Sequence, residues 1–257
     1  MPNEALYLYG IVKNAYDIDW AMQGIDRKPV FTVTEGGLSA MVHELGEKPD
    51  LPTDVVKVKE RVIAHNEVLS KAMGDFGGVA PLKFGTVIVS KNGKSASDNL
   101  KEWLKEGEER LEKVWESIKG KKEYGIRIYY RKKQLVSELG ETSELSAIKK
   151  GIREKSAGVA YLLKGKLESQ TAELLRAKVN RFKEVFYELL KGLTDDVVVN
   201  MSKLAINAED DLLLNVSVLG KEDEITLIRE SLEKYADDGF SYHFVGPFAP
   251  YSFVENV

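Results

Sequence analysis

The second half of the chain switches between strand and helix periodicity in a fixed order, which restricts the fold more than any other feature. Polar and apolar residues alternate over residues 124–131, as in a strand with one buried face. Helical spacing follows from about residue 142 to 191, with breaks expected near Gly151, Gly158 or Gly165. The further expected elements are strands at 197–207 and 212–219 joined by a turn at 208–211, a helix at 222–236 and a strand at 240–245. This β-α-β-β-α-β order predicts a ferredoxin-like module, an antiparallel sheet with two helices on one face.

The first half predicts a small antiparallel sheet with helices. Residues 5–13 are rich in aromatic and β-branched types, and Gly36 and Gly37 separate two strand-like segments as in a hairpin. The expected elements are a short helix at 16–24, strands at 30–34 and 38–44, a helix from 55 to about 73 capped by Thr53, a strand at 79–90 and a helix at 96–118. The predicted fold class is therefore α+β with two domains, residues 1–120 and 121–257.

Charge and composition narrow the class of function. The 257 residues include 37 Lys and Arg against 41 Asp and Glu, and the net charge of −4 argues against a general nucleic-acid binder. The absence of cysteine excludes disulfides, thiolate metal sites and cysteine nucleophiles. No apolar run approaches the roughly 18 residues that span a bilayer, and the first residues lack a secretory pattern. We therefore expect a cytoplasmic protein that binds neither nucleic acid nor membrane.

One segment resembles a phosphate-binding loop but lacks a required residue. Residues 91–95 (KNGKS) lie between a predicted strand and a predicted helix, as a P-loop does. A P-loop needs a glycine five residues before its Gly-Lys pair, so that backbone amides can surround the phosphates. That position is Ile88, and Gly85 lies too far upstream, so we expect no nucleotide cofactor.

The three histidines share no spacing that suits a metal ion. His43 and Glu44 begin a zincin-like match, but Glu47 stands where the second histidine would be. His65 lies on the apolar stripe of its predicted helix, which favours a hydrogen-bonded core residue, and His243 is one member of a strand face. The Gly-x-Ser-x-Gly nucleophile motif is also missing. We therefore expect no catalytic, cofactor-binding or metal-binding residue, and no enzyme.

Two apolar stretches have no chemical explanation, residues 79–87 and the tail 245–254. Prolines keep the tail from extending a helix and disfavour a central strand, yet several of its residues are large and apolar. Such a tail must be covered, and packing against its own chain is favoured over packing against a partner.

Five short segments occur in one order along the chain: residues 7–12 (YLYGIV), 65–69 (HNEVL), 81–86 (PLKFGT), 158–162 (GVAYL) and 246–253 (GPFAPYSF). On these segments the chain resembles the GvpF/GvpL family of gas vesicle proteins over essentially its full length. It departs from the family pattern with Lys83 for arginine, Phe248 for tryptophan and Ala249 for proline. Lysine keeps the charge but loses the forked donor set of arginine, which puts a bidentate pair at position 83 in doubt.

The resemblance implies an accessory protein of gas vesicle assembly, present in small amounts beside the major shell protein, with no enzymatic activity and no known cofactor. It implies the hydrophobic shell protein and other accessory proteins as partners, and the cytoplasm and the gas vesicle as locations. A minor component of the shell is a further role that it allows. We predict partner-binding residues within the two apolar stretches: Pro81, Leu82, Lys83, Phe84, Pro247, Phe248, Tyr251 and Phe253.

Two functions of other classes stay open on the residues alone. The first is a small-molecule-binding regulatory module, because ferredoxin-like modules often bind ligands. The second is RNA binding through the aromatic strand 124–131, which basic runs flank at 119–122 and 131–133. The basic-glycine-aromatic signature of RNA-recognition strands is absent from it.

Overall fold

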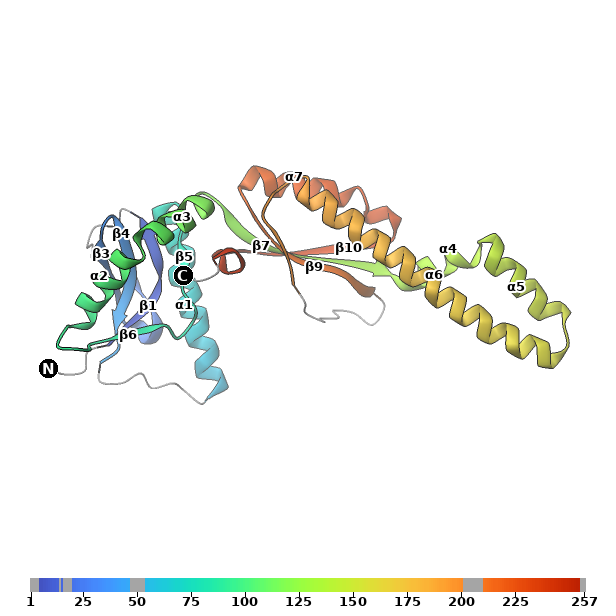
Figure 1. Cartoon of the computed structure of the whole chain (residues 1–257), viewed down its shortest axis with the longest axis horizontal. Coiled ribbons are helices and arrows are strands. Elements are labelled where there is room, and N and C mark those ends of the chain that lie inside the picture. The colour runs from blue at the N-terminus through green and yellow to red at the C-terminus, as the bar shows by residue number, and fades with distance from the viewer. Residues whose placement is uncertain (1–4, 14, 16–19, 47–53, 201–209, 255–257) are drawn as a thin grey trace. The chain divides into compact units, whose positions relative to one another are not determined.

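The computed structural model describes residues 5–13, 15, 20–46, 54–200 and 210–254, and the chain forms two compact units (Figure 1). The first unit comprises residues 1–124, 219–222 and 246–257, and the second comprises 125–218 and 223–245. The sequence places the boundary at 120 and assigns the whole tail to the second domain. In the structure the tail from residue 246 belongs to the first unit because its apolar side chains pack there.

The first unit is built on an antiparallel sheet. Its strands are β1 (Ala5–Lys13), β2 (Met22–Gln23), β3 (Pro29–Glu35), β4 (Leu38–Glu44), β5 (Ala80–Pro81) and β6 (Val87–Val89). Their order is β2-β3-β4-β1-β5, and β6 also pairs with β1. β1 is therefore the central strand, and it pairs with β4 from Leu6 opposite Glu44 to Lys13 opposite Leu38.

Helices cover both faces of this sheet, so β1 is buried on both sides. The helices are α1 (Val55–Phe76), α2 (Ala96–Glu106) and α3 (Glu108–Ile118). Leu6 and Leu8 pack into a core that includes Leu100 of α2, whereas Tyr7 and Tyr9 pack into a core that includes Leu69 of α1. Successive strand residues point to opposite faces, which explains why aliphatic and aromatic residues alternate along β1.

The second unit contains a sheet with the order β10-β7-β9-β8. Its strands are β7 (Lys122–Arg131), β8 (Val197–Val199), β9 (Asp210–Gly220) and β10 (Phe240–Phe248), and its helices are α4 (Lys132–Gly140), α5 (Ser143–Glu154), α6 (Ala157–Lys191) and α7 (Glu222–Glu233). The C-terminal part of α6 carries the buried Phe186 and Leu190, and the Phe186 ring meets the Phe240 ring edge to face at 5.1 Å. α6 also packs against α5 and α4.

The predicted mixture of helices and sheets is confirmed, with two sheets and seven α-helices among the described residues. Three predictions of single elements are wrong. Residues 96–118 form two helices, because the chain breaks at Gly107. Residues 79–90 form two short strands separated by a turn at Gly85, where φ is +90°. Residues 132–140, which had no predicted element, form α4.

Other predicted elements differ from the structure at their ends or lie partly outside the described residues. The long helical region breaks between α5 and α6, at residues 155–156, within the expected range. The cap of α1 is Asp54, whose side chain accepts a hydrogen bond from Val56 N, and the predicted cap Thr53 lies outside the described residues. Of the expected helix at 16–24, residues 16–19 lie outside the described part and residues 22–23 form β2. The expected strand over 201–207 and the first half of the expected turn at 208–211 also lie outside it, whereas residues 210–211 belong to β9.

Gly10, next to Tyr9 in β1, is required by close packing. A Cβ at Gly10 would lie 2.8 Å from Ala80 O and 2.8 Å from Val79 Cγ2, whereas a Cβ at Gly74 of α1 would meet no atom within 4 Å. G10A should therefore lower the free energy of unfolding by about 1–3 kcal/mol through overpacking, and G74A should raise it by up to about 1 kcal/mol through helix propensity.

Denaturant titration followed by tryptophan fluorescence measures both changes. Trp20, Trp103 and Trp115 are the only tryptophans of the chain and all lie in the first unit, so the signal reports on that unit. A G10A variant as stable as the unaltered protein would contradict the described contact between β1 and β5.

Candidate functional site

A chain of hydrogen bonds runs through the core between β1 and α1. Gly85 N donates to the Tyr7 hydroxyl at 3.1 Å, and the same hydroxyl lies 2.8 Å from His65 Nδ1. The other ring nitrogen, His65 Nε2, lies 2.8 Å from the Tyr251 hydroxyl. His65 thus has a partner on both ring nitrogens, and the prediction of a hydrogen-bonded core histidine is confirmed.

A second tyrosine–histidine pair lies beside the first. The Tyr9 hydroxyl accepts a hydrogen bond from Ile25 N at 2.8 Å and lies 2.8 Å from His43 Nδ1. His43 Nε2 is buried and has no hydrogen-bond partner among the described residues. The Tyr7 ring stacks on the His43 ring at 5.1 Å and the Tyr9 ring stacks on the His65 ring at 5.3 Å, so the two pairs form one packed cluster.

Burial holds this cluster neutral near pH 7. It lowers the pKa of both His43 and His65 from 6.5 to about 4, because a buried imidazolium loses its hydration. The Lys28 charge lowers the pKa of His43 further. Burial likewise raises the pKa of Tyr7 to about 12 and raises the pKa of Tyr9 and of Tyr251. None of these groups changes charge near neutral pH, so the cluster is suited to holding the structure together rather than to proton transfer.

The C-terminal tail is held at two points by the first unit. Besides the Tyr251 hydroxyl on His65, the buried Glu123 carboxylate accepts hydrogen bonds from Ser252 N at 2.9 Å and from Ser252 Oγ at 2.6 Å. Ala249 and Val254 are buried in the two cores of the unit. The prediction that the tail packs against its own chain is therefore confirmed for these residues.

The structure separates the predicted partner-binding residues into two groups. Pro81 and Leu82 are buried, and Phe253 packs partly buried against the first core. The exposed group consists of Lys83, Phe84, Pro247, Phe248 and Tyr251. Two of these come together, because the rings of Phe84 and Tyr251 both lie against His65, with centroids at 5.8 Å and 6.5 Å.

The sequence pattern alone missed the importance of Tyr7, Tyr9 and His43. The sequence feature that indicates the two tyrosines is their alternation with aliphatic residues in β1. This alternation places both phenols on the face that meets α1. Their histidine partners lie 58 and 34 residues further along the chain, and residue types do not reveal such pairing.

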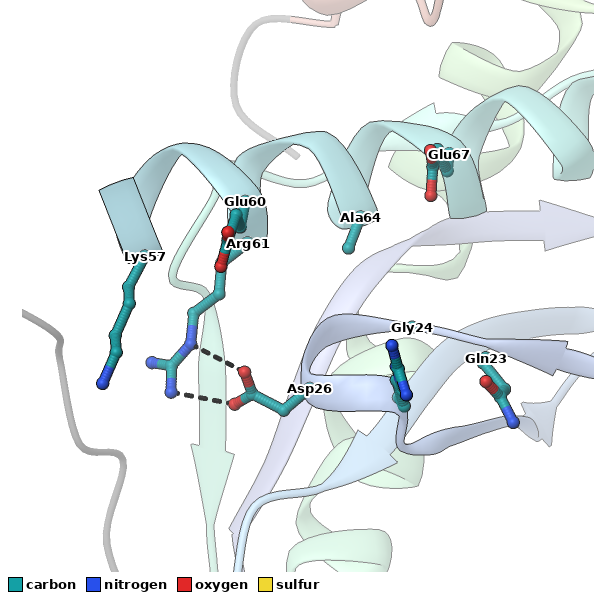
Figure 2. Close-up of a pocket in the computed structure, with 9 residues that line it drawn as sticks. Gln23, Gly24, Asp26, Lys57, Glu60, Arg61, Ala64 and Glu67 are labelled. Carbon is teal, nitrogen blue, oxygen red and sulfur yellow. Dashed lines mark hydrogen bonds and ion pairs between the residues drawn. The ribbon is translucent and has the colours of Figure 1, made fainter. Parts of the chain in front are cut away.

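A pocket of about 520 Å³ lies between α1 and the turn after β2. Figure 2 shows Arg61 reaching from α1 to Asp26, where Nη2 lies 2.8 Å from Oδ2 and Nε lies 3.2 Å from Oδ1. The residues that line the pocket are Gln23, Gly24, Asp26, Arg27, Lys57, Glu60, Arg61, Ala64 and Glu67. Small-molecule sites are mostly lined by apolar side chains with a few polar groups, whereas this lining carries both signs of charge and Ala64 as its apolar side chain, so it selects no ligand class.

The described residues contain no group of three or more His, Asp or Glu side chains placed to hold a metal ion. Within the same ranges, no helix combines the length and the hydropathy needed to cross a membrane.

This chain resembles known proteins in both sequence and fold. The family model described as "Gas vesicle synthesis protein GvpL/GvpF" matches residues 5–255. Gas vesicle protein L of Haloferax mediterranei is 23% identical over 93% of this chain and 75% of its own length, and gas vesicle protein F of Microcystis aeruginosa is 23% identical over 98% of both. The crystal structure of GvpF from Anabaena sp. PCC7120 superposes with a TM-score of 0.73 and 21% identity over 99% of both chains, which shows the same fold.

The neutral histidines predict a stability that depends on pH. In the unfolded chain both histidines regain a pKa near 6.5, so below that pH the unfolded state binds more protons than the folded state. The contribution of the two neutral histidines to the free energy of unfolding is therefore fully present well above pH 6.5. It falls as the pH drops toward 4. Between pH 7 and pH 5 the expected loss is about 2 kcal/mol per histidine.

Denaturant titrations at pH 7 and pH 5 measure this loss, and proton NMR of the histidine rings shows its origin. The His43 and His65 rings should remain neutral at pH 5 in the folded protein. The variant H243Q, at an exposed position of β10, identifies the third ring signal and should keep the loss. Protonation of His43 and His65 near pH 6.5 without unfolding would contradict their burial.

Proposed function

Because the chain belongs to the GvpL/GvpF family of gas vesicle synthesis proteins, we propose that it is an accessory protein that binds the hydrophobic shell subunit and other accessory proteins during assembly. Relatives named gas vesicle protein L and gas vesicle protein F support a role in gas vesicle assembly. The proposal adds the partners, and it includes retention of a small amount of the protein in the finished shell.

The observation that carries the proposal is the set of exposed aromatic side chains Phe84, Phe248 and Tyr251 on the first unit, which we name the aromatic patch. Phe84 and Tyr251 both lie against His65, and Phe248 stands three residues before Tyr251 in the tail. The exposed fractions of Phe84, Phe248 and Tyr251 are 38%, 48% and 37%. Phe84 and Tyr251 are fixed by their contacts with the buried His65, so they are presented on a rigid support. Rigid aromatic side chains lose little entropy on binding, which is why they dominate many interfaces.

The physical need for such a patch follows from the assembly. A shell subunit that polymerises into a gas-filled wall exposes apolar surface before it is incorporated, and that surface drives aggregation in water. A partner with exposed aromatic side chains covers it by burying area. Fully burying one phenylalanine contributes about 1.5–3 kcal/mol, so a few such residues suffice for a reversible complex.

A second feature of the structure supports the same role. β8 is the last strand in the order of the second sheet, and it consists of Val197, Val198 and Val199. Val198 and Val199 are exposed. An apolar strand at the end of a sheet suits the addition of a partner strand, in which backbone hydrogen bonds supply affinity.

We also propose that the protein is not an enzyme and that its second unit is ferredoxin-like. The tyrosines and histidines of the cluster have pKa values far from neutral, which supports a structural role for them. Numbered within the second unit, the strand order β10-β7-β9-β8 is 4-1-3-2. Along the chain, the strands and helices of this unit follow the order β-α-β-β-α-β, with α4 and α5 added before α6. This order supports the ferredoxin-like assignment.

Co-expression of the tagged full chain with the shell subunit tests the proposal. We expect the shell subunit to co-purify, and F248S should weaken its capture about tenfold or more through the lost aromatic burial. The matched control is V89S in β6, whose side chain is also about half exposed and lies outside the aromatic patch.

The thermal unfolding of each variant must match that of the unaltered protein before capture is compared. Equal capture by F248S, V89S and the unaltered chain would remove the aromatic patch from the proposal. Absence of capture by the unaltered, folded chain, with the other accessory proteins present, would overturn the proposal itself.

A further inference from the structure

The end of the α5–α6 hairpin concentrates positive charge. Residues 149–166, which comprise the end of α5, the connection and the start of α6, contain six basic residues and one acidic residue. The basic residues are all exposed: Lys149, Lys150, Arg153, Lys155, Lys164 and Lys166. The acidic residue is Glu154, whose Oε1 lies 3.9 Å from Lys150 Nζ. The whole chain carries a net charge of −4, so this segment, named here the basic hairpin end, differs in sign from the rest of the molecule.

Apolar side chains lie within the same segment. Tyr161 and Leu162 are exposed to 77% and 71%, and Val159 is also exposed. A Cβ at Gly158 or at Gly165 would meet no atom within 4 Å, so the surface beside Leu162 is low and open. Glycines at such positions allow the backbone of another helix to approach closely.

These apolar side chains are not what holds the hairpin together. α5 and the first part of α6 run side by side (Figure 1), and their contact includes Leu163, whose Cδ1 would lie 3.2 Å from a Cβ at Gly151. The buried residue of α5 is Leu145. Tyr161 and Leu162 are exposed on α6, so their apolar surface is available for a partner.

We propose that the basic hairpin end is a docking surface for an acidic amphipathic helix of another gas vesicle protein. The inference rests on the proposed function and extends it by a second contact surface, separate from the aromatic patch. Acidic side chains of the partner pair with Arg153 and with the lysines other than Lys149, whose Nζ donates a hydrogen bond to Gly140 O, and one apolar face covers Tyr161 and Leu162. Opposite charges around a small apolar centre give both specificity and a fast association rate.

The observations favour a protein over a nucleic acid or a lipid surface. The phosphates of a nucleic acid would pair with the lysines but would leave Leu162 and Val159 without an apolar counterpart. The acidic remainder of the chain would in addition be repelled by an anionic polymer or an anionic bilayer. A helix with acidic and apolar faces satisfies both parts of the surface.

Site-specific photo-crosslinking in cells that produce gas vesicles tests this inference. The full chain carries a photoreactive phenylalanine analogue in place of Tyr161, and the crosslinked peptide is identified by mass spectrometry. We expect a segment of another gas vesicle protein in which acidic residues outnumber basic ones. The double variant K164E/K166E should reduce the crosslink about tenfold.

The matched control is R181E/K183E, which reverses two exposed basic residues with the same spacing on the same helix, outside the basic hairpin end. This control should leave the crosslink unchanged. Equal losses in both double variants, or crosslinks only to a second copy of this chain, to RNA, to lipid or to a segment without acidic excess, would overturn the inference. Capture of the shell subunit without any crosslink from position 161 would overturn this inference alone, whereas failure of that capture would overturn the proposed function.

Discussion

The fold of the first unit depends on His65, whose two ring nitrogens join segments from opposite ends of the chain. Nδ1 lies 2.8 Å from the hydroxyl of Tyr7 in β1, and Nε2 lies 2.8 Å from the hydroxyl of Tyr251 in the tail. The ring is buried and its pKa is about 4, so each nitrogen must find a neutral partner. Losing either hydroxyl would remove a hydrogen bond from this buried ring, which lowers stability by about 1–3 kcal/mol.

This constraint links the structure of the protein to its proposed role. The tail carries Phe248 and Tyr251 of the aromatic patch, and the bonds to His65 and Glu123 determine where they are presented. Phe84 is placed by the turn at Gly85, whose N–H donates to Tyr7. The same buried hydrogen bonds therefore stabilise the core and position the exposed aromatic residues. The basic hairpin end is built differently, because helix–helix packing and exposed charge define it.

The sequence predicted the class of the fold and most of its elements, because periodicity reports which face of each element is buried. It failed where a local break decided the outcome, as at Gly107, where one amphipathic stripe continues through two helices. It predicted His65 as a core residue from its place on the stripe of α1, but not its partners. Tyr251 lies 186 residues away, and such a pairing depends on how the whole unit folds. Four of the five segments of family resemblance contain Tyr7, His65, Phe84 and Tyr251 but do not show that these residues meet.

The most direct test of this account removes one atom, the hydroxyl oxygen of Tyr251. In Y251F the ring remains but His65 Nε2 loses its hydroxyl partner, so the free energy of unfolding of the first unit should fall by about 1–3 kcal/mol. Y161F removes the same atom from a tyrosine exposed on α6 and should change the free energy by less than about half a kcal/mol. Tryptophan fluorescence during denaturation measures the first unit in both variants. Equal stability of Y251F and Y161F would contradict the claim that the tail is anchored through His65.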